Sequence, residues 1–228
     1  MTRDKKSCHV SNIHKKYGDL VVLDDASFGF SQDKITTIIG PNGCGKSSLV
    51  KIIAGIDKDF QGELNVPQTI AYLSQKSGLL PWLSTRQNLD FPRKVKKITA
   101  SVDIDEVLKQ FSLTDFADYY PSQLSGGMQR KVEILRSVMY QPELLIMDEP
   151  FAALDAITRR QMIYWLKKLQ KQSQMTIIAV SHDIAESVEI SDRIVVMDKR
   201  PARIIKTLDM DGTNRDKTIQ SLERMLVA

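Results

Sequence analysis

Gly40-Pro41-Asn42-Gly43-Cys44-Gly45-Lys46-Ser47 matches the phosphate-binding loop pattern at every fixed position. Its glycines let successive backbone N–H groups turn towards a phosphate, and a following helix offers its positive end. In such a loop Lys46 reaches the β- and γ-phosphates, and Ser47 places its hydroxyl on Mg²⁺. A dinucleotide loop needs the different spacing G-x-G-x-x-G. We therefore expect a nucleotide site from Gly40 through Ser47, with Ser48 beside it.

The segments around this loop predict an α/β fold. The run 35–39 is β-branched and predicts a strand, and a helix should follow from Lys46 to about Ala54, where Gly55 ends it. Further along, strand and helix patterns alternate, which predicts a parallel sheet. The predicted strands are 21–30, 63–66, 70–74, 144–147, 176–180, 193–197 and 203–208. The predicted later helices are 157–170, a short one beginning near 183, and a polar one at the C-terminus.

The stretch 78–140 differs in texture from the rest of the chain. Its strand patterns vanish, and helical spacing takes over, as in Val107, Leu108 and Phe111. We interpret 78–140 as a helical subdomain inserted into a single domain of 1–228, because the alternating pattern resumes after it. A chain of 228 residues with 42% hydrophobic residues is large enough to bury such a core.

Composition excludes several classes of protein. No apolar run approaches the roughly 20 residues of a membrane span, and the polar start Met1–Lys6 leads into no signal region. We therefore expect neither a membrane-spanning nor an exported chain. Cys8 and Cys44 form no disulfide or zinc pattern, which fits a reducing cytosol. The net charge is only +4, and we interpret the basic clusters 93–97 and 199–203 as solvated surface rather than a nucleic-acid track.

A second motif ends the predicted strand 144–147. The apolar run is followed by two carboxylates, Asp148 and Glu149, which by themselves suit a charged strand end. Beside a phosphate loop, however, Mg²⁺ is held by few carboxylates together with phosphate oxygens and water. We expect Asp148 to bind Mg²⁺, and Glu149, which points elsewhere on an extended chain, to act as base towards the attacking water.

A third motif separates this chain from small-molecule kinases and GTPases, which share the first two. Leu124-Ser125-Gly126-Gly127-Met128-Gln129 would alone suit a turn that caps a helix. With the other motifs in order, the chain from Val10 to Arg203 resembles the ATPases of ABC (ATP-binding cassette) transporters. That resemblance implies a P-loop core with an N-terminal antiparallel β layer, and ATP and Mg²⁺ as cofactors.

The resemblance also implies roles for residues outside the phosphate loop. Tyr17 matches the aromatic that stacks on adenine, Gln75 matches a glutamine near Mg²⁺ and the attacking water, and His182 matches a histidine at the γ-phosphate. Two further motifs act across a subunit boundary in this family. Ser125, Gly126 and Gly127 match the signature loop, which contacts ATP on the opposite subunit, and Asp155 lies in the loop that crosses the dimer interface.

The implied setting is a membrane transporter. We expect a homodimer on ATP binding, docked on integral membrane permease subunits at the cytoplasmic face, with a solute-binding protein as an indirect partner and no nucleic acid. The stretches 78–83 and 195–201 resemble importers for nitrate, sulfonates, taurine and pyrimidine-type precursors. An exporter or lipid extractor, or a soluble ABC ATPase acting in DNA repair, chromosome structure or translation, remain the alternatives.

Two features of this chain stand apart from the motifs. The signature continues Met128-Gln129-Arg130-Lys131 where the subfamily usually has Met-Arg-Gln-Arg, and Glu133 and Leu135 occupy positions of small residues.

Separately, the apolar cluster 79–82 follows Gln75 closely and ends in Trp82. A tryptophan on a loop suits a docking anchor for the membrane partner, and packing inside the helical insert is the alternative.

Overall fold

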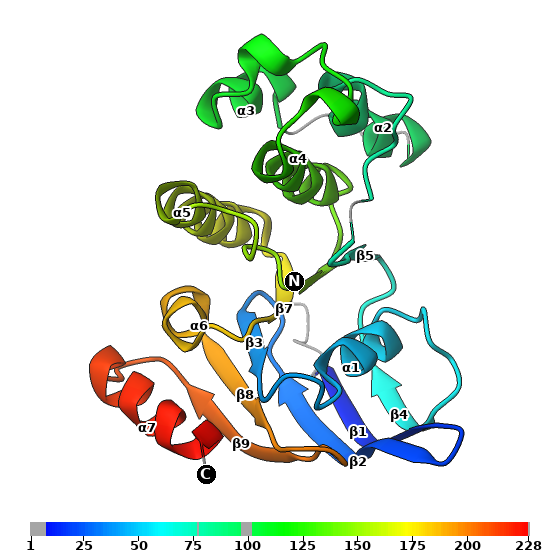
Figure 1. The fold of residues 1–228 in the computed structure, drawn as a ribbon, viewed down its shortest axis with the longest axis vertical. Helices are drawn as coiled ribbons and strands as arrows, with labels where there is room; N and C mark the ends of the chain where they lie inside the picture. Colours follow the sequence, from blue (N-terminus) through cyan, green and yellow to red (C-terminus); the bar gives the residue numbers. More distant parts are fainter. Residues whose placement is uncertain (1–7, 77, 97–101, 228) are drawn as a thin grey trace, which may run out of the picture.

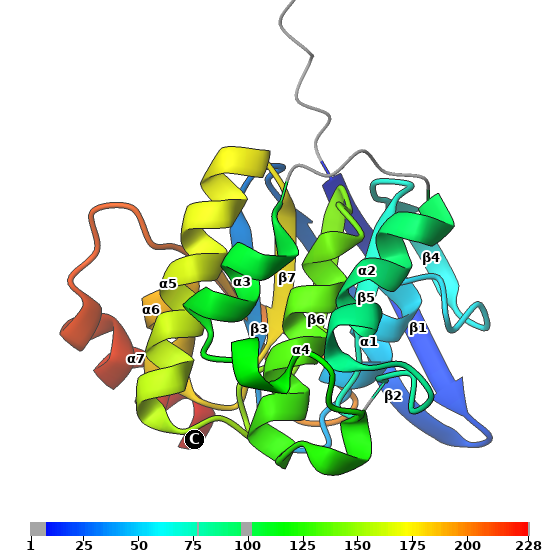
Figure 2. The ribbon, with the colours of Figure 1, turned by 90° about the horizontal axis from the view of Figure 1, so that it is seen from above.

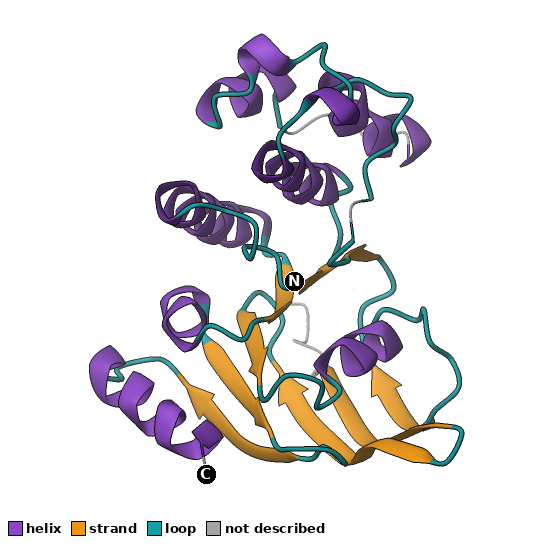
Figure 3. Cartoon of the chain, in the orientation of Figure 1, coloured by secondary structure: helices purple, strands orange, loops and turns teal. Residues whose placement is uncertain are grey.

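The computed structural model describes residues 8–76, 78–96 and 102–227, so the polar start Met1–Lys6 and Lys97 of the first basic cluster lie outside the described residues. It contains two sheets and a set of helices stacked on one of them (Figures 1 and 3). The smaller sheet has the order β2-β1-β4 and is wholly antiparallel. The expected N-terminal antiparallel layer is therefore confirmed. Its strands are β1 (Cys8–Tyr17), β2 (Leu20–Phe30) and β4 (Gln61–Asn65).

The larger sheet has the order β5-β6-β7-β3-β8-β9. Its central strands are buried at every residue, which explains why their sequences are mostly apolar or β-branched and do not alternate with exposed polar residues. The first five strands in this order are parallel to one another, as predicted. The strands are β3 (Ile35–Ile39), β5 (Ile70–Leu73), β6 (Leu144–Asp148), β7 (Thr176–Val180), β8 (Arg193–Met197) and β9 (Ile204–Asp209).

The last strand departs from the predicted direction. β9 pairs with β8 in antiparallel register, so the prediction of a parallel sheet is wrong for this strand. The reason is the length of the connection 198–203, because a parallel return needs a crossover of about a dozen residues or more. The turn after β8 lies next to the phosphate loop that follows β3, because β8 is parallel to β3 and paired with it.

Helices cover both faces of the larger sheet. α1 (Lys46–Ile53) begins directly after Gly45 and ends before Gly55, whose φ of +70° allows the chain to leave the helix. α5 (Ala156–Ser173) lies beside the helical insert, and α6 (Ile184–Ile190) packs with α7 (Arg215–Val227) (Figures 1 and 2). Within the part of the chain that the structure describes, no helix is long and apolar enough to cross a membrane.

The helical insert lies above the sheet in Figure 1. Its apolar side chains belong to the same buried cluster as one face of the sheet, for example Leu89 and Leu108 with Leu145. The insert therefore shares its core with the sheet, although the prediction of one domain over 1–228 stays a prediction. Its elements are α2 (Thr85–Lys96), α3 (Ile104–Gln110), the 3₁₀ turns η1 (Thr114–Phe116) and η2 (Pro121–Gln123), and α4 (Gly126–Met139).

Candidate nucleotide site

The phosphate loop lies between β3 and α1 and is shaped by close packing. A Cβ at Gly40 would lie 2.8 Å from the carbonyl oxygen of Met197, at the end of β8. Gly45 has a φ of +125°, and a Cβ there would lie 2.8 Å from a methyl carbon of Val22. Position 40 therefore needs glycine for space, and position 45 needs it both for space and for backbone conformation. The neighbouring strands determine the path of the loop.

Lys46 lies across the inside of this loop. Its side chain is only 6% exposed, and Nζ donates hydrogen bonds to the carbonyl oxygens of Gly40 (2.7 Å) and Pro41 (2.9 Å). Cys44 has its thiol in the apolar core, while its backbone N–H donates to the carbonyl of Pro41. At position 44 only the backbone is thus available to a ligand, whereas Lys46 holds a full positive charge beside the loop.

Asp148 closes the base of the site at the end of β6. Its Oδ1 accepts a hydrogen bond from the Ser47 hydroxyl at 3.2 Å, and its Oδ2 accepts one from the Tyr72 hydroxyl at 3.3 Å. Burial raises the pKa of Asp148 above its ordinary value, and the charge of Glu149 adds to this, while the two hydroxyls and Lys51 oppose it. Burial and the Asp148 carboxylate raise the pKa of Tyr72 to about 12. A hydroxyl paired with a carboxylate offers the hard oxygen ligands that fit Mg²⁺.

Glu149 and His182 meet at the ends of two neighbouring strands. His182 follows β7, and its Nδ1 lies 3.4 Å from Oε1 of Glu149. Glu149 has a φ of +49°, and its N–H donates to the carbonyl of Val180 at 3.0 Å. Such a conformation is uncommon for a residue other than glycine and is typical of functional sites. It directs the Glu149 carboxylate away from Asp148 and into the pocket described next.

A pocket of about 580 Å³ joins these groups. One wall comes from Tyr17, which is 48% exposed and whose hydroxyl donates to Asp57 Oδ2 at 3.0 Å. Lys15 lies over the Tyr17 ring, 4.7 Å from Nζ to the ring centroid. The residues expected from the sequence that line the pocket are Tyr17, Asn42, Gly43, Gly45, Lys46, Ser47, Ser48, Gln75, Glu149 and His182.

Arg200 also lines this pocket and was missed by the sequence analysis. Its guanidinium donates to the carbonyl oxygen of Gly43, with Nε at 3.0 Å. Arg200 is exposed, as the interpretation of 199–203 as solvated surface predicts, but that interpretation gave it no part in the nucleotide site. The only signal in the sequence was a basic residue shortly after a predicted strand. That this strand, β8, lies beside β3 and its phosphate loop is known only from the fold. Leu20 and Val22 of β2 complete the additional lining.

The signature loop lies elsewhere. Eight of the expected site residues are not among those that line the pocket. Gly40, Pro41, Cys44 and Asp148 are bonded or adjacent to lining residues, whereas Ser125, Gly126, Gly127 and Asp155 belong to other elements. Ser125 caps α4 by accepting the N–H of Met128, and Asp155 caps α5 by accepting two N–H groups. Hydrogen bonds from the Thr158 side chain and backbone lower the pKa of Asp155. Figure 1 shows α4 in the insert, well separated from α1.

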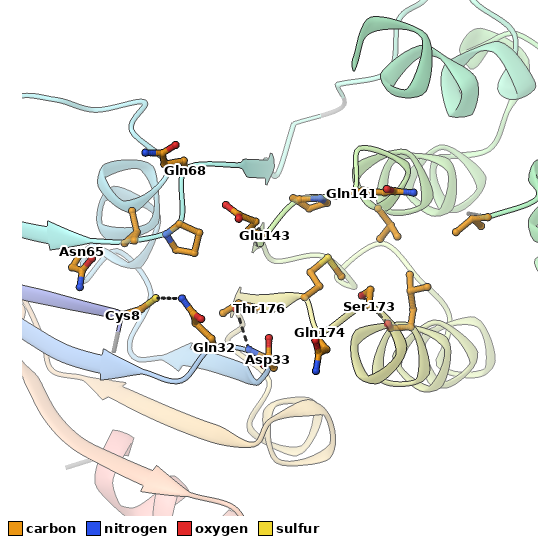
Figure 4. Close-up of a pocket in the computed structure, with 17 residues that line it drawn as sticks. Cys8, Gln32, Asp33, Asn65, Gln68, Gln141, Glu143, Ser173, Gln174 and Thr176 are labelled. Carbon is orange, nitrogen blue, oxygen red and sulfur yellow. Dashed lines mark hydrogen bonds between the residues drawn. The ribbon is translucent and has the colours of Figure 1, made fainter. Parts of the chain in front are cut away.

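A larger pocket of about 980 Å³ opens at the opposite ends of the strands (Figure 4). It lies at the amino ends of the strands, where Asp33 precedes β3, Glu143 precedes β6, and Thr176 begins β7. The N–H of Asp33 donates to the Thr176 hydroxyl at 3.1 Å. None of the expected site residues lines it. The smaller pocket is the better nucleotide site, because ligands of open α/β sheets bind at the carboxyl ends of the strands.

Comparison with known proteins places the chain in a family. The protein-family profile described as "ABC transporter" matches residues 23–152. The aliphatic sulfonates import ATP-binding protein SsuB of Bacillus anthracis is 36% identical over 220 residues, which cover 92% of this chain and 88% of that protein. SsuB 1 of Pseudomonas savastanoi pv. phaseolicola is 36% identical over 198 residues, covering 85% and 81%.

A solved structure agrees with this placement. The dimeric ATP-binding cassette MJ0796 in a post-hydrolysis state, bound to ADP and Pi, superimposes with a TM-score of 0.78 at 26% identity. The match covers 90% of this chain and 100% of that one. The chain therefore belongs to the ABC transporter family, as one of its ATP-binding and ATP-hydrolysing cassettes.

Proposed function

We propose that this chain is the ATP-hydrolysing subunit of an importer for sulfonate-type anions, a group that includes taurine, with nitrate as a related candidate. The carrying observation is the single pocket that brings the phosphate loop together with Gln75, Glu149 and His182 from three strand ends. Relatives named as sulfonate import proteins support import over export. The stretches 78–83 and 195–201 support the same solute class.

The pocket divides ATP recognition among several elements. Tyr17 stacks on the adenine, and the backbone N–H groups of 42–47 surround the phosphates. Lys46 exchanges its present carbonyl partners, Gly40 and Pro41, for the β- and γ-phosphate oxygens. Mg²⁺, where it is bound, neutralises charge on those phosphates. Ser47, Asp148 and Gln75 would hold it, since the first two already lie in contact and Gln75 lines the same pocket.

Hydrolysis uses the two groups at the ends of β6 and β7. The carboxylate of Glu149 accepts a proton from the attacking water, and His182 contacts the γ-phosphate. The short distance between these side chains places both on one side of the pocket. Catalysis of phosphoryl transfer depends mostly on positioning and charge neutralisation, so the γ-phosphate must be enclosed on its remaining side as well.

A second copy of the chain supplies that enclosure. Ser125, Gly126 and Gly127 lie outside the pocket of their own chain, at the exposed N-terminus of α4. We assign them to the ATP of the partner subunit, with Asp155 in the loop between the two sites. The dimeric state of the MJ0796 cassette with ADP and Pi supports the assembly of two copies. ATP then holds two copies together, and hydrolysis releases them.

Trp82 is the proposed contact with the membrane permease. Its side chain is 68% exposed, so the alternative in which it packs inside the helical insert is wrong. Its neighbour Leu79 is buried in the core and anchors the loop. Asn88 is fully buried and holds the backbone of the loop 80–83. Its side chain accepts the N–H of Leu80 and donates to the carbonyls of Leu80 and Leu83. A rigid loop with an exposed tryptophan suits a docking anchor at the cytoplasmic face of a membrane.

The importer assignment is tested by solute uptake. Cells that carry their own permease and solute-binding protein are compared with cells in which the chromosomal copy of this chain carries Lys46→Ala. We expect uptake of labelled taurine or an alkanesulfonate to fall at least about tenfold, because loss of one phosphate-binding charge weakens ATP binding. Labelled nitrate serves as the second solute, and an unrelated amino acid serves as the control. Unchanged uptake of all sulfonates and nitrate would reject the solute class.

A further inference from the structure

The two departures noted after the signature loop form a buried pair. Arg130 is 5% exposed and Glu133 is 3% exposed, and Arg130 Nη1 lies 3.0 Å from Glu133 Oε2. They stand one turn apart on α4, so their side chains share a face of the helix. The subfamily's usual residues at these positions, glutamine and a small residue, carry no charge. Each departure therefore neutralises the other.

Arg130 also contacts the backbone at the carboxyl ends of β5 and β6, which carry Gln75 and Glu149. Apart from Glu133, the guanidinium donates to four carbonyl oxygens, those of Ser74 (2.7 Å), Asp148 (3.1 Å), Glu149 (3.0 Å) and Pro150 (2.8 Å). Nε, Nη1 and Nη2 all take part, which uses the fixed fork of the side chain fully. A lysine at this position has three donors on one nitrogen and is unable to span the same set of acceptors.

Glu133 extends the same network along the chain. Its Oε1 accepts the N–H of Gly78 at 3.0 Å, while Arg130 holds the carbonyl of Ser74. The pair thus binds the backbone on both sides of Gln75. Gln75 itself lines the nucleotide pocket, whereas neither Arg130 nor Glu133 is among the described residues that line it. The pair acts on the site only through the backbone that carries the site residues.

The contact between Arg130 and the carbonyl of Glu149 stabilises an unusual backbone conformation of Glu149. A φ of +49° is unfavourable for glutamate, so surrounding contacts must maintain it. Val180 holds the N–H of Glu149, and Arg130 holds its carbonyl. With both sides of the residue fixed, the carboxylate is directed into the pocket towards His182.

We propose that Arg130 and Glu133 form a positioning pair for hydrolysis, which holds Gln75 and Glu149 in a common frame and ties both to α4. The signature loop begins the same helix, so contact of Ser125 with a partner's nucleotide reaches Gln75 and Glu149 through the first two turns of α4. The inference rests on the proposed hydrolysis at this pocket. It assigns the effect of the pair to the turnover step rather than to ATP binding.

Two variants of the full-length chain separate positioning from simple stabilisation. Arg130→Lys keeps the charge beside Glu133 but loses the fork. The double variant Arg130→Gln with Glu133→Ala removes both charges, so no unpaired charge stays buried. For each folded variant we expect kcat for ATP to fall about tenfold or more, while the Kd for ATP stays within about threefold of wild type. Arg86→Lys is the matched control, because Arg86 lies on α2 of the same insert but pairs with Asp105 on α3 and, among the described residues, does not contact the backbone around Gln75. Its kcat should stay within about twofold.

The outcomes distinguish this inference from the function on which it rests. A wild-type chain that fails to hydrolyse ATP with Mg²⁺ in solution, with or without its permease, would reject the proposed hydrolysis. If the wild type is active and both variants are folded with normal kcat, the pair only joins α4 to the core, and the inference fails. The inference is also overturned if ATP affinity falls in parallel with kcat. It is equally overturned if thermal unfolding shows that neither variant is folded.

Discussion

The α/β core and the helical insert carry their functional residues in opposite ways. In the core, buried parallel strands end at one edge, and residues as distant in sequence as Ser47, Glu149 and His182 line a single pocket. In the insert, Ser125 and Trp82 are exposed, the first at the start of a helix and the second on a loop. The core therefore gathers its half of the proposed site within one chain, whereas the insert exposes groups that we assign to contacts with other chains.

The two regions also differ in what holds their functional residues. The core relies on strand ladders within an apolar environment, from β5 across to β8. The segment between β5 and the insert is held by side chains that bond to backbone, chiefly Asn88, Arg130, Glu133 and Arg136. Changes in the core should therefore affect chemistry directly, and changes in the insert should affect it through partners or through this segment.

The largest expected effect comes from Glu149→Gln in the core. Removing the base should lower the ATP hydrolysis rate by about 10²–10⁴ while ATP affinity stays near wild type. Because we propose that hydrolysis separates the two copies, this variant should accumulate as an ATP-bound dimer. Turnover, ATP affinity and sedimentation with ATP and with ADP measure the three quantities.

Lys46→Ala is the control for this variant, since it should weaken nucleotide binding itself and leave the chain monomeric. Near-normal turnover of Glu149→Gln would remove Glu149 from its role. A Glu149→Gln chain that stays monomeric at saturating ATP would contradict this division of roles, because the signature loop in the insert would then have no partner site to complete.

A smaller effect, confined to the partner, is expected from Trp82→Ala in the insert. The exposed side chain contributes little to folding, so the free energy of unfolding should change by no more than about 0.5 kcal/mol. ATP binding should also be unchanged. If Trp82 is a docking anchor, binding to the permease should weaken by about 2 kcal/mol, roughly 30-fold. Thermal unfolding and sulfonate uptake are measured together.

Tyr164→Ala provides the matched control, because Tyr164 is similarly exposed, at 70%, but lies on α5 outside the insert. A strongly lowered melting temperature in the Trp82 variant would show that this side chain packs after all. Normal uptake in both variants would remove Trp82 from the docking surface.

The smallest effect concerns stability and comes from Asp148→Asn. The folded-state pKa of Asp148 is raised above the ordinary 3.8, so ionisation is disfavoured in the folded chain. The stability that this group contributes is present below its unfolded pKa and is lost as pH rises through its folded pKa. An asparagine stays neutral, so without nucleotide the variant should be more stable at pH 7 by about 1 kcal/mol, a typical gain at a functional site.

Thermal unfolding across pH, with and without Mg²⁺ and ATP, checks this prediction. The variant should gain stability relative to wild type as pH rises above the unfolded pKa, and should lose the additional stabilisation by Mg²⁺. Asp115→Asn, at an exposed position, should leave both quantities unchanged. An Asp148→Asn chain that is less stable than wild type at pH 7 would show that the charge is compensated in the folded state.

Local sequence patterns predicted much of this molecule. The strand 35–39, the helix from Lys46 and the stop at Gly55 agree with β3 and α1, because these signals depend on nearest neighbours in the chain. Core strands such as β6 and β7 were equally clear from their apolar runs. The first strand, β1, was not placed by residue, since its sequence mixes charged and apolar side chains.

Contacts between distant segments decided the rest. Arg200 reaches Gly43 because β8 lies beside β3, and β9 turns back because its connection is short. Arg130 and Glu133 read in the sequence as departures from a family pattern, and only the fold shows that they meet each other and the backbone of Ser74 and Glu149. The sequence by itself therefore determined the nucleotide loop, its class of fold and its family. Tertiary structure alone decided which remote side chains share the site, because hydrogen bonds and burial depend on distances in space that residue spacing does not encode.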